Sequence, residues 1–228
     1  MLATVLAVIL FTLVYEILYL NHEIERDNQI VDQLDLELSQ AEMIALRKEL
    51  DPHFIFNSLN TLSQLIRQDV NKAYQFNQKL AEVYKYFVVN RTKEIVPLQN
   101  EIDFIGNYFY LLQIRYGAKL NLNMSLSNID SGIFIIPSAL QLLIENAIKH
   151  NKFSLEHPLD IFIQMCHEYI TVQNNVIPQS SYVDSTRVGL RNLNSQYLIL
   201  SKKHIVTEKH ENLFTVKLPV VTQKIFQS

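Results

Sequence analysis

His53 is the first side chain that could do chemistry. It directly follows Pro52, and Asn57 lies one helical turn after it. The apolar residues of this stretch recur at spacings of four and three, which predicts a seam facing another helix: Ile55, Leu59, Leu62 and Ile66. At about 100° per residue, His53 and Asn57 fall on the side away from the seam, so we expect the imidazole to face solvent. An exposed neutral imidazole is a competent nitrogen nucleophile. The alternative is a histidine that simply lies on a solvated face.

A second polar group lies on a helix predicted over residues 138–150. One side of this helix is apolar: Leu140, Leu143, Ile144, Ala147 and Ile148. Glu145, Asn146, Lys149 and His150 gather on the other side as neighbours three and four residues apart. An amide oxygen can bind Mg²⁺ and an ammonium group can neutralise phosphate, so this composition suits a magnesium-bound polyphosphate. The alternative is a solvated helix face.

The composition describes a folded and largely helical protein. Hydrophobic residues make up 48% of 228, with only four glycines and six prolines, which is enough for one or two small domains. The net charge of −3 and the absence of a long basic run argue against nucleic-acid binding. The single cysteine, Cys166, cannot form an intrachain disulfide, has no set of zinc-spaced partners and is expected to pack inside the protein.

The N-terminal fifty residues are expected to be helical throughout. Residues 1–20 are predominantly apolar and about long enough to span a bilayer, and no signal-peptide pattern is present, which predicts a membrane helix. The alternative is a helix buried against protein. Residues 21–50 contain no proline or glycine and keep an approximate heptad, which predicts a short coiled-coil connector leading into the His53 helix. A merely amphipathic helix is the alternative there.

Two more helices follow the His53 helix. After a polar connection at residues 67–71, the first has a candidate apolar face: Tyr74, Leu80, Val83, Tyr84 and Phe87. Two helices joined by so short a connection predict an antiparallel hairpin, and two copies would form a four-helix bundle. The next helix is predicted over residues 99–116, carries Glu101, Tyr108 and Arg115, and ends at Gly117.

From residue 119 the apolar pattern changes to alternation. A half-buried strand is predicted at 120–126, and residues 133–136 lead into Pro137 as a first-turn residue of the 138–150 helix. Further strands are predicted at 159–165, 169–173, 204–207 and 213–218, with a helix near 190–200. This order predicts an α+β fold, with a helix layer on one face of a mostly antiparallel sheet.

Several motifs together resemble the LytS/YehU-type sensor histidine kinase family. Residues 51–60 read D-P-H-F-I-F-N-S-L-N, which is similar to its phosphoacceptor motif. Ile136-Pro137 followed by L-Q-L-L-I-E-N-A-I-K-H at 140–150 is similar to its nucleotide-binding N box. V-G-L-R-N-L at 188–193 resembles a later glycine-containing box. A helix found between the two leading motifs is matched by Leu98, Glu101, Tyr108 and Arg115. The resemblance covers about residues 40–220.

The resemblance implies a dimeric membrane kinase of a bacterial two-component system. It implies a membrane helix at 1–20, a coiled-coil connector at 21–50, dimerisation and histidine phosphotransfer helices at 51–116, and a Bergerat-type (GHKL) ATP-binding α/β sandwich at 117–228. His53 would take the γ-phosphoryl group of Mg-ATP and pass it to a response regulator, commonly of the LytTR type. The protein would lie in the inner (cytoplasmic) membrane with its catalytic part in the cytoplasm.

The resemblance also assigns the site residues. Asn146 would hold Mg²⁺, Lys149 would contact phosphate, and Gly189 would let the backbone approach the nucleotide. The remaining nucleotide contacts expected are His150, Asn174 and Leu190. Asn57 is expected to act beside His53, and Glu145 is the first choice for removing its proton, with Asp51 and His150 as alternatives.

Two departures from the family pattern keep other functions open. Asn174 stands where the family has an aspartate that accepts from adenine, and a neutral amide should hold the base less firmly. Arg187 replaces the first glycine of the later box. One alternative is therefore a non-catalytic dimeric regulator with weakened nucleotide binding. The other is an ATPase in which Glu145 activates water, which leaves His53 without a role.

Overall fold

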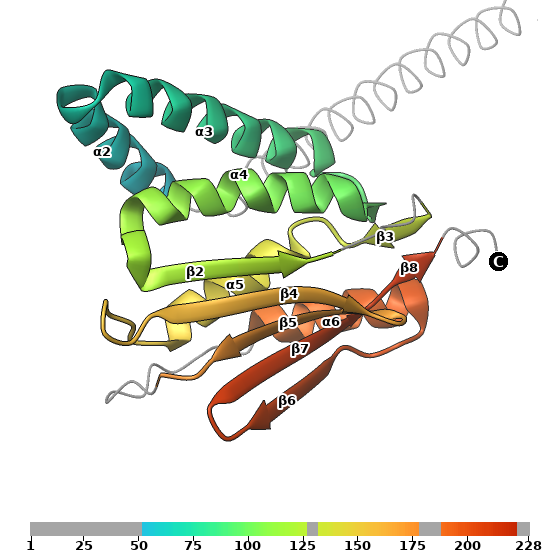
Figure 1. Ribbon diagram of the computed structural model, residues 1–228. Coiled ribbons are helices and arrows are strands. Elements are labelled where there is room, and N and C mark those ends of the chain that lie inside the picture. Colours follow the sequence, from blue (N-terminus) through green and yellow to red (C-terminus); the bar gives the residue numbers. More distant parts are fainter. Residues whose placement is uncertain (1–51, 127–131, 178–187, 223–228) are drawn as a thin grey trace, which may run out of the picture. The chain divides into compact units, whose positions relative to one another are not determined.

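The computed structural model describes residues 52–126, 132–177 and 188–222 (Figure 1). The chain divides into two units, Met1–Ile55 and Phe56–Ser228, and only the helical residues 52–55 of the first are described. The predicted membrane helix at 1–20 and connector at 21–50, together with Asp51 and Arg187, lie outside the described residues. Among the helices that are described, none combines the length and the apolar character needed to cross a bilayer.

The first two described helices are separated by a single residue. Helix α2 spans Pro52–Gln68 and helix α3 spans Val70–Asn90. Asp69 lies between them, and its Oδ1 caps α3 by accepting a hydrogen bond from the Lys72 backbone N–H at 3.0 Å. The predicted seam of α2 is not covered within the described chain, because Leu59 and Ile66 are 53% and 57% exposed.

Helix α4 spans Leu98–Tyr116 and packs along α3 in the antiparallel sense. Lys79 Nζ of α3 donates to Asn107 Oδ1 of α4 at 2.9 Å. The buried face of α3 differs from the prediction, and it comprises Ala73, Phe76, Leu80, Val83 and Asn90. Tyr74 is 64% exposed, because it lies one residue off a face whose members recur every three or four positions. Helix α4 ends as predicted at Gly117, which has a φ of 60° and opens the 3₁₀ turn η1 (Gly117–Lys119).

The main sheet has five strands in the order β2-β4-β5-β7-β6. These are β2 (Leu120–Ser125), β4 (Leu159–Cys166), β5 (Tyr169–Asn175), β7 (Leu213–Pro219) and β6 (Val206–His210). Only β2 and β4 pair in parallel, so the predicted mostly antiparallel sheet and the α+β class are confirmed. A second, three-stranded sheet was not predicted: β1 (Val96–Pro97), β3 (Ile133–Ile135) and β8 (Val221–Thr222).

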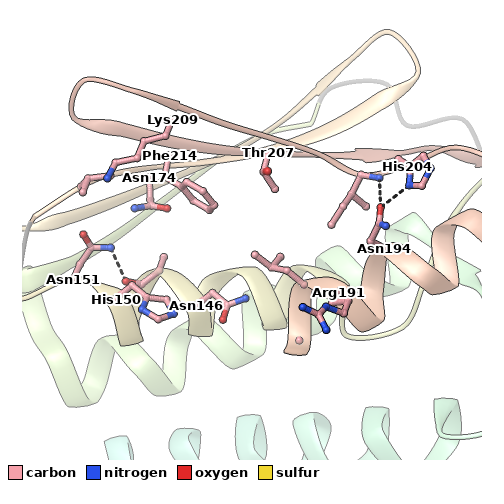
Figure 2. Close-up of a pocket in the computed structure, with 15 residues that line it drawn as sticks. Asn146, His150, Asn151, Asn174, Arg191, Asn194, His204, Thr207, Lys209 and Phe214 are labelled. Carbon is pink, nitrogen blue, oxygen red and sulfur yellow. Dashed lines mark hydrogen bonds between the residues drawn. The ribbon is translucent and has the colours of Figure 1, made fainter. Parts of the chain in front are cut away.

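Helices α5 (Ala139–His150) and α6 (Val188–Ser201) cover one face of the main sheet (Figures 1 and 2). Four of the five residues of the predicted apolar face of α5 are buried, namely Leu140, Leu143, Ile144 and Ala147, and the fifth, Ile148, is half-buried. The core between the layers also contains Leu120, Leu159, Ile161, Ile163, Ile170, Tyr197, Val216 and Leu218. Burial of this apolar surface is the main stabilising contribution to the fold.

Two details of the prediction are wrong. Pro137 was placed in the first turn of α5, but the helix begins at Ala139, after Ser138 in a left-handed conformation with φ 60° and ψ 13°. Cys166 was expected to pack inside, but it is exposed. It is the last residue of β4, where the alternation of buried and exposed positions turns its side chain away from the helix layer.

Candidate functional site

A cavity of about 840 Å³ lies between helices α5 and α6 and the inner face of the main sheet (Figure 2). Its walls come from the end of α5, the first turns of α6, and strands β5, β6 and β7 with their adjoining loops. It gathers five of the residues predicted to bind a nucleotide: Asn146, His150, Asn174, Gly189 and Leu190. Three separate stretches of the sequence thus meet at one hollow.

Helix α5 points its four predicted site residues in two directions. Asn146 and His150, one turn apart, line the cavity. Lys149 is exposed and is not among the lining residues. Glu145 is half-buried, and its Oε1 accepts hydrogen bonds from Tyr108 Oη of α4 and from Gln141 Nε2, both at 2.8 Å. Its carboxylate is therefore engaged with α4 and the preceding turn of α5.

The C-terminal end of α5 is tied to the segment that follows β5. Asn151 is buried, and its Nδ2 donates to the Ala147 carbonyl at 2.8 Å. Its Oδ1 accepts from the backbone N–H of Ile177 at 2.6 Å. One side chain thus satisfies a free carbonyl of the last helical turn and holds an adjoining loop, so this end of the cavity is firmly built.

The sheet wall of the cavity is set by strand register. Asn174 of β5 pairs with Phe214 of β7, and Phe214 pairs with Lys209 of β6, so these three side chains form a row that faces the helices (Figure 2). Asn174 is 5% exposed, and its Nδ2 donates to the Asn175 carbonyl at 2.6 Å. The acceptor that Asn174 offers to a ligand is therefore its amide oxygen.

The wall formed by α6 depends on a close approach between helices. A Cβ added at Gly189 would lie 3.2 Å from Leu142 Cδ1 of α5, so the missing side chain allows α6 to begin close beside α5. Further along α6, Asn194 Oδ1 accepts from the Ile205 backbone N–H at 3.0 Å and lies 3.3 Å from His204 Nδ1 (Figure 2). These contacts join α6 to the start of β6.

The electrostatics of the cavity favour an anion. Arg191 and Lys209 bring two positive charges, and none of the described lining residues is an aspartate or glutamate. The whole chain has a net charge of −3, so this lining departs from the average. Burial, with a smaller contribution from the Lys149 charge, lowers the pKa of His150 below its usual value, so its imidazole is predominantly neutral at pH 7. Ala147, Leu190 and Phe214 supply apolar surface beside these groups.

Asn146 is the one predicted metal ligand. In the described parts of the chain, no cluster of three or more His, Cys, Asp or Glu residues could hold an ion unaided. The Nδ2 atom of Asn146 is buried without a hydrogen-bond partner among the described residues. This nitrogen is a hydrogen-bond donor, so it fits a ligand that brings an acceptor, such as a phosphate oxygen. The amide oxygen of the same side chain is the atom that could ligate Mg²⁺, which is commonly held by one or two protein oxygens together with phosphates and water.

His53 and Asn57 lie on α2. His53 is exposed, as its position opposite the predicted seam required. Asn57 is half-buried, and its backbone carbonyl accepts from Thr61 Oγ1 at 2.9 Å. His53 belongs to the unit Met1–Ile55, whereas all the cavity residues belong to the unit Phe56–Ser228.

Sequence reasoning missed much of the cavity wall. The missed residues include Asn151, Arg191, Asn194, His204, Lys209 and Phe214. Arg191 lies inside the glycine-containing motif and could have been taken from it. For Phe214, the alternation of strand 213–218 was a usable signal, since it places Phe214, Val216 and Leu218 on one face. Lys209 had no local signal, because its position depends on pairing between β6 and β7.

The comparisons with known proteins agree with the motifs. Residues 41–120 match the family model for histidine kinases. The chain is 30% identical over 150 residues to the sensor protein LytS of Staphylococcus saprophyticus, covering 61% of this chain and 25% of that protein. It is 30% identical over 143 residues to the sensor histidine kinase/phosphatase LytS of Staphylococcus aureus, covering 60% of this chain and 24% of that protein.

Among solved structures, the histidine kinase AdeS of Acinetobacter baumannii aligns with a TM-score of 0.38 at 17% identity, covering 69% of this chain and 82% of that one. The chain spans about a quarter of the length of the curated relatives it matches. The family match at residues 41–120 includes the motif around His53. The chain is therefore similar in sequence to LytS-type sensor histidine kinases, the family that its motifs resemble.

Proposed function

We propose that this chain carries the phosphoacceptor helix and the ATP-binding unit of a two-component sensor histidine kinase. The observation that carries the proposal is the cavity, which gathers Asn146, His150, Asn174, Gly189 and Leu190 against a lining whose described residues include no carboxylate. Such a lining suits a nucleoside triphosphate, because the phosphates are anionic and the base needs apolar surface with a few polar contacts.

His53 is the proposed acceptor of the phosphoryl group. A ring nitrogen of its exposed imidazole attacks the γ-phosphorus, a P–N bond forms as the bond to the β–γ bridging oxygen breaks, ADP leaves and a ring proton is lost. Phosphoryl transfer needs alignment and charge neutralisation. Arg191 and Lys209 supply positive charge in the cavity. Mg²⁺ held by the Asn146 oxygen would neutralise phosphate charge.

The remaining predicted site residues are Asn57, Lys149 and Glu145, and the last two can act only if their side chains move. Asn57, one turn after His53, is proposed to act beside the imidazole. Lys149 reaches the phosphates only if its exposed side chain turns toward the cavity. Glu145 removes a proton from His53 only if its carboxylate leaves Tyr108 and Gln141, at the cost of two hydrogen bonds.

The proposed partners follow from the same function. The phosphoryl group passes to an aspartate of a response regulator, for which we retain the LytTR type. A second copy of the chain is proposed to cover the exposed apolar residues of α2 and α3, including Leu59, Ile66 and Val70. A membrane helix at residues 1–20 would anchor the protein in the bacterial inner membrane, with the cavity in the cytoplasm.

Labelled ATP tests the enzyme directly. The full chain in detergent, with γ-labelled ATP and Mg²⁺, should acquire acid-labile label that is lost in His53→Gln and kept in His157→Gln, which alters another exposed histidine. Asn146→Ala should reduce the label by at least about tenfold, whereas Asn123→Ala on the exposed side of β2 should not. Full labelling of His53→Gln would place the acceptor elsewhere and end this proposal.

A non-catalytic regulator is the second candidate, and Asn174 favours it. Its neutral amide replaces the carboxylate expected to bind adenine, and its nitrogen is engaged with the Asn175 carbonyl. This candidate predicts that the chain forms dimers but takes up no label on His53. Micromolar Mg-ATP binding that depends on Asn146, together with labelling of His53, would exclude it.

A further inference from the structure

Glu101 of α4 is buried beneath the start of α5. Its side chain is 0% exposed, and both of its oxygens are engaged. Oε1 accepts from the Leu140 backbone N–H at 3.1 Å, and Oε2 accepts from the Ser138 backbone N–H at 3.0 Å and from the Tyr86 hydroxyl. A buried carboxyl with donors from α3 and from the start of α5 is costly to place, so its contacts determine how these elements meet.

The start of α5 depends on this carboxyl. Ser138 precedes the helix but makes no capping bond through its own side chain, so Glu101 supplies the acceptor from another helix. Ser138 also has φ 60° and ψ 13°, a left-handed conformation that is unfavourable for a residue with a Cβ. Such a conformation persists only where neighbouring contacts fix it, and the Glu101 carboxyl makes the contact to the Ser138 N–H.

Tyr86 brings α3 into the same cluster. Its ring stacks on Phe104 of α4, with centroids 4.0 Å apart and planes 11° apart, and this orientation sends the hydroxyl to Glu101. The hydrogen bond from Tyr86 therefore fixes the position of α3 along α4 at the same carboxyl that caps α5. Any movement of α3 that withdraws Tyr86 removes one of the three donors to Glu101.

Helix α5 connects this cluster to the cavity. Its first turn is held by Glu101, and its middle is held by the hydrogen bond from Tyr108 to Glu145, next to Asn146. Its last turn carries His150 and lines the cavity with Asn146. A helix of 12 residues held at these points moves as one body, so a change at Ser138 reaches the cavity wall.

We propose that Tyr86 and Glu101 are a pair of positioning residues that couple helix α3 to helix α5 and, through α5, to the cavity. Neither residue lines the cavity, so their action is on the placement of Asn146 and His150. The part that concerns the cavity rests on the proposed nucleotide-binding function. Because α3 directly follows the helix that carries His53, the pair gives the phosphoacceptor part of the chain a route to nucleotide affinity.

Removal of one hydroxyl tests the coupling. Tyr86→Phe deletes the donor to Glu101 and keeps the stacked ring. Tyr84→Phe is the matched control, because Tyr84 lies on the same helix and its buried hydroxyl has no partner among the described residues. Amide hydrogen exchange of residues 138–150 in the full chain without nucleotide should become faster by roughly fivefold in Tyr86→Phe. In Tyr84→Phe it should stay within about twofold.

Nucleotide titration completes the test. The dissociation constant of Mg-ADP should rise by roughly fivefold in Tyr86→Phe and should not change in Tyr84→Phe. Unchanged exchange in α5 of Tyr86→Phe overturns the coupling, and faster exchange with unchanged affinity overturns its extension to the cavity. If the unsubstituted chain binds no Mg-ADP, the proposed function fails, and the exchange comparison alone decides the coupling.

Discussion

Helices α2 and α3 differ from helices α4 and α5 in where their large apolar side chains lie. Seven of these on α2 and α3 are exposed, by 53 to 71%: Phe56, Leu59, Ile66, Val70, Tyr74, Val88 and Val89. Every exposed residue of α4 and α5, in contrast, is polar or glycine. The second pair of helices completes its core within one chain, while the first leaves apolar surface that water disfavours. One part of the molecule buries its large apolar side chains within the chain, and the other leaves many of them exposed.

The stability of the part that contains α4 and α5 should depend strongly on one buried carboxyl, that of Glu101. Glu101→Ala leaves two backbone N–H groups and the Tyr86 hydroxyl without their acceptor and opens a small cavity. We expect a loss of about 3–5 kcal/mol in the free energy of unfolding. Urea denaturation followed by circular dichroism measures it. Glu82→Ala on the exposed side of α3 should cost under about 0.5 kcal/mol, and equal losses in the two variants would show that Glu101 has no special part.

Substitutions on the exposed apolar surface of α2 should weaken dimerisation strongly and change the stability of the fold much less. Replacing both Leu59 and Ile66 with glutamine removes exposed apolar surface from α2 without lowering helix propensity greatly. We expect the dissociation constant of the homodimer to rise by about 100-fold, as two lost apolar contacts imply. Analytical ultracentrifugation of the full chain in detergent is the measurement. Ile199→Gln, which alters an isoleucine 71% exposed on α6, is the control; a similar loss of dimer there would put the interface elsewhere.

The pH dependence of stability distinguishes the two regions as well. Burial raises the pKa of Glu101 to about 7 from its usual 4.5, although its hydrogen bonds from Tyr86, Ser138 and Leu140 oppose this. The folded protein therefore keeps a proton that the unfolded chain releases near pH 4.5, so this contribution is complete below that pH and is lost as the pH rises to about 7. The titratable groups that face Glu101 are Tyr86 of α3 and Tyr197 of α6.

Between pH 5 and pH 8, the unsubstituted chain should lose about 2 kcal/mol more stability than Glu101→Gln. Glutamine cannot titrate, so urea denaturation of the two chains in parallel removes the contribution of every other group. Parallel pH profiles would mean that Glu101 is already ionised throughout this range. The apolar surface of α2 has no such dependence, and the dimer constant of Glu101→Gln should follow that of the unsubstituted chain.

The smallest expected effect is at the contact between α5 and α6. Gly189→Ala places a Cβ 3.2 Å from Leu142 Cδ1, which a rotation of the leucine side chain can relieve. We expect a change in unfolding free energy of under about 1 kcal/mol, measured by thermal denaturation. Adding Leu142→Ala to this variant should remove the clash, so the double variant should lose only the unfolding free energy that Leu142→Ala loses alone. A severe loss in Gly189→Ala would show that backbone freedom at this position matters more than space.

The sequence predicted the elements whose causes are local. Helix α5 has its apolar residues at helical spacing over several turns, and α4 ends where Gly117 permits a positive φ, so both could be located from their own residues. Strands β1 and β8 could not be located in this way, because two residues form a strand only where a distant partner meets them. The left-handed Ser138 was hidden for the same reason, since its stabilising acceptor is 37 residues away.

The candidate site divides along the same line. Asn146 and His150 share a motif and a helix face, and the sequence placed them together. Glu145 is adjacent to Asn146 in the motif but points to Tyr108, because neighbouring helical positions are separated by about 100°. Lys209 lies at the cavity because strand β6 pairs with strand β7, and this pairing could not be predicted from the residues near Lys209 alone.

Asn174, Phe214 and Lys209 form one wall of the cavity only because the strand register places all three side chains on the same face of the sheet. Alternate residues of a strand face opposite sides, so deleting one residue from the tight turn at Glu211 and Asn212 would shift every later position of β7 by one step. Phe214 and Val216 would then exchange places with neighbours such as Thr215, whose side chains now lie on the opposite face of the sheet. We therefore expect the wall to tolerate substitutions at its surface far better than a change of one residue in the length of the hairpin that carries it.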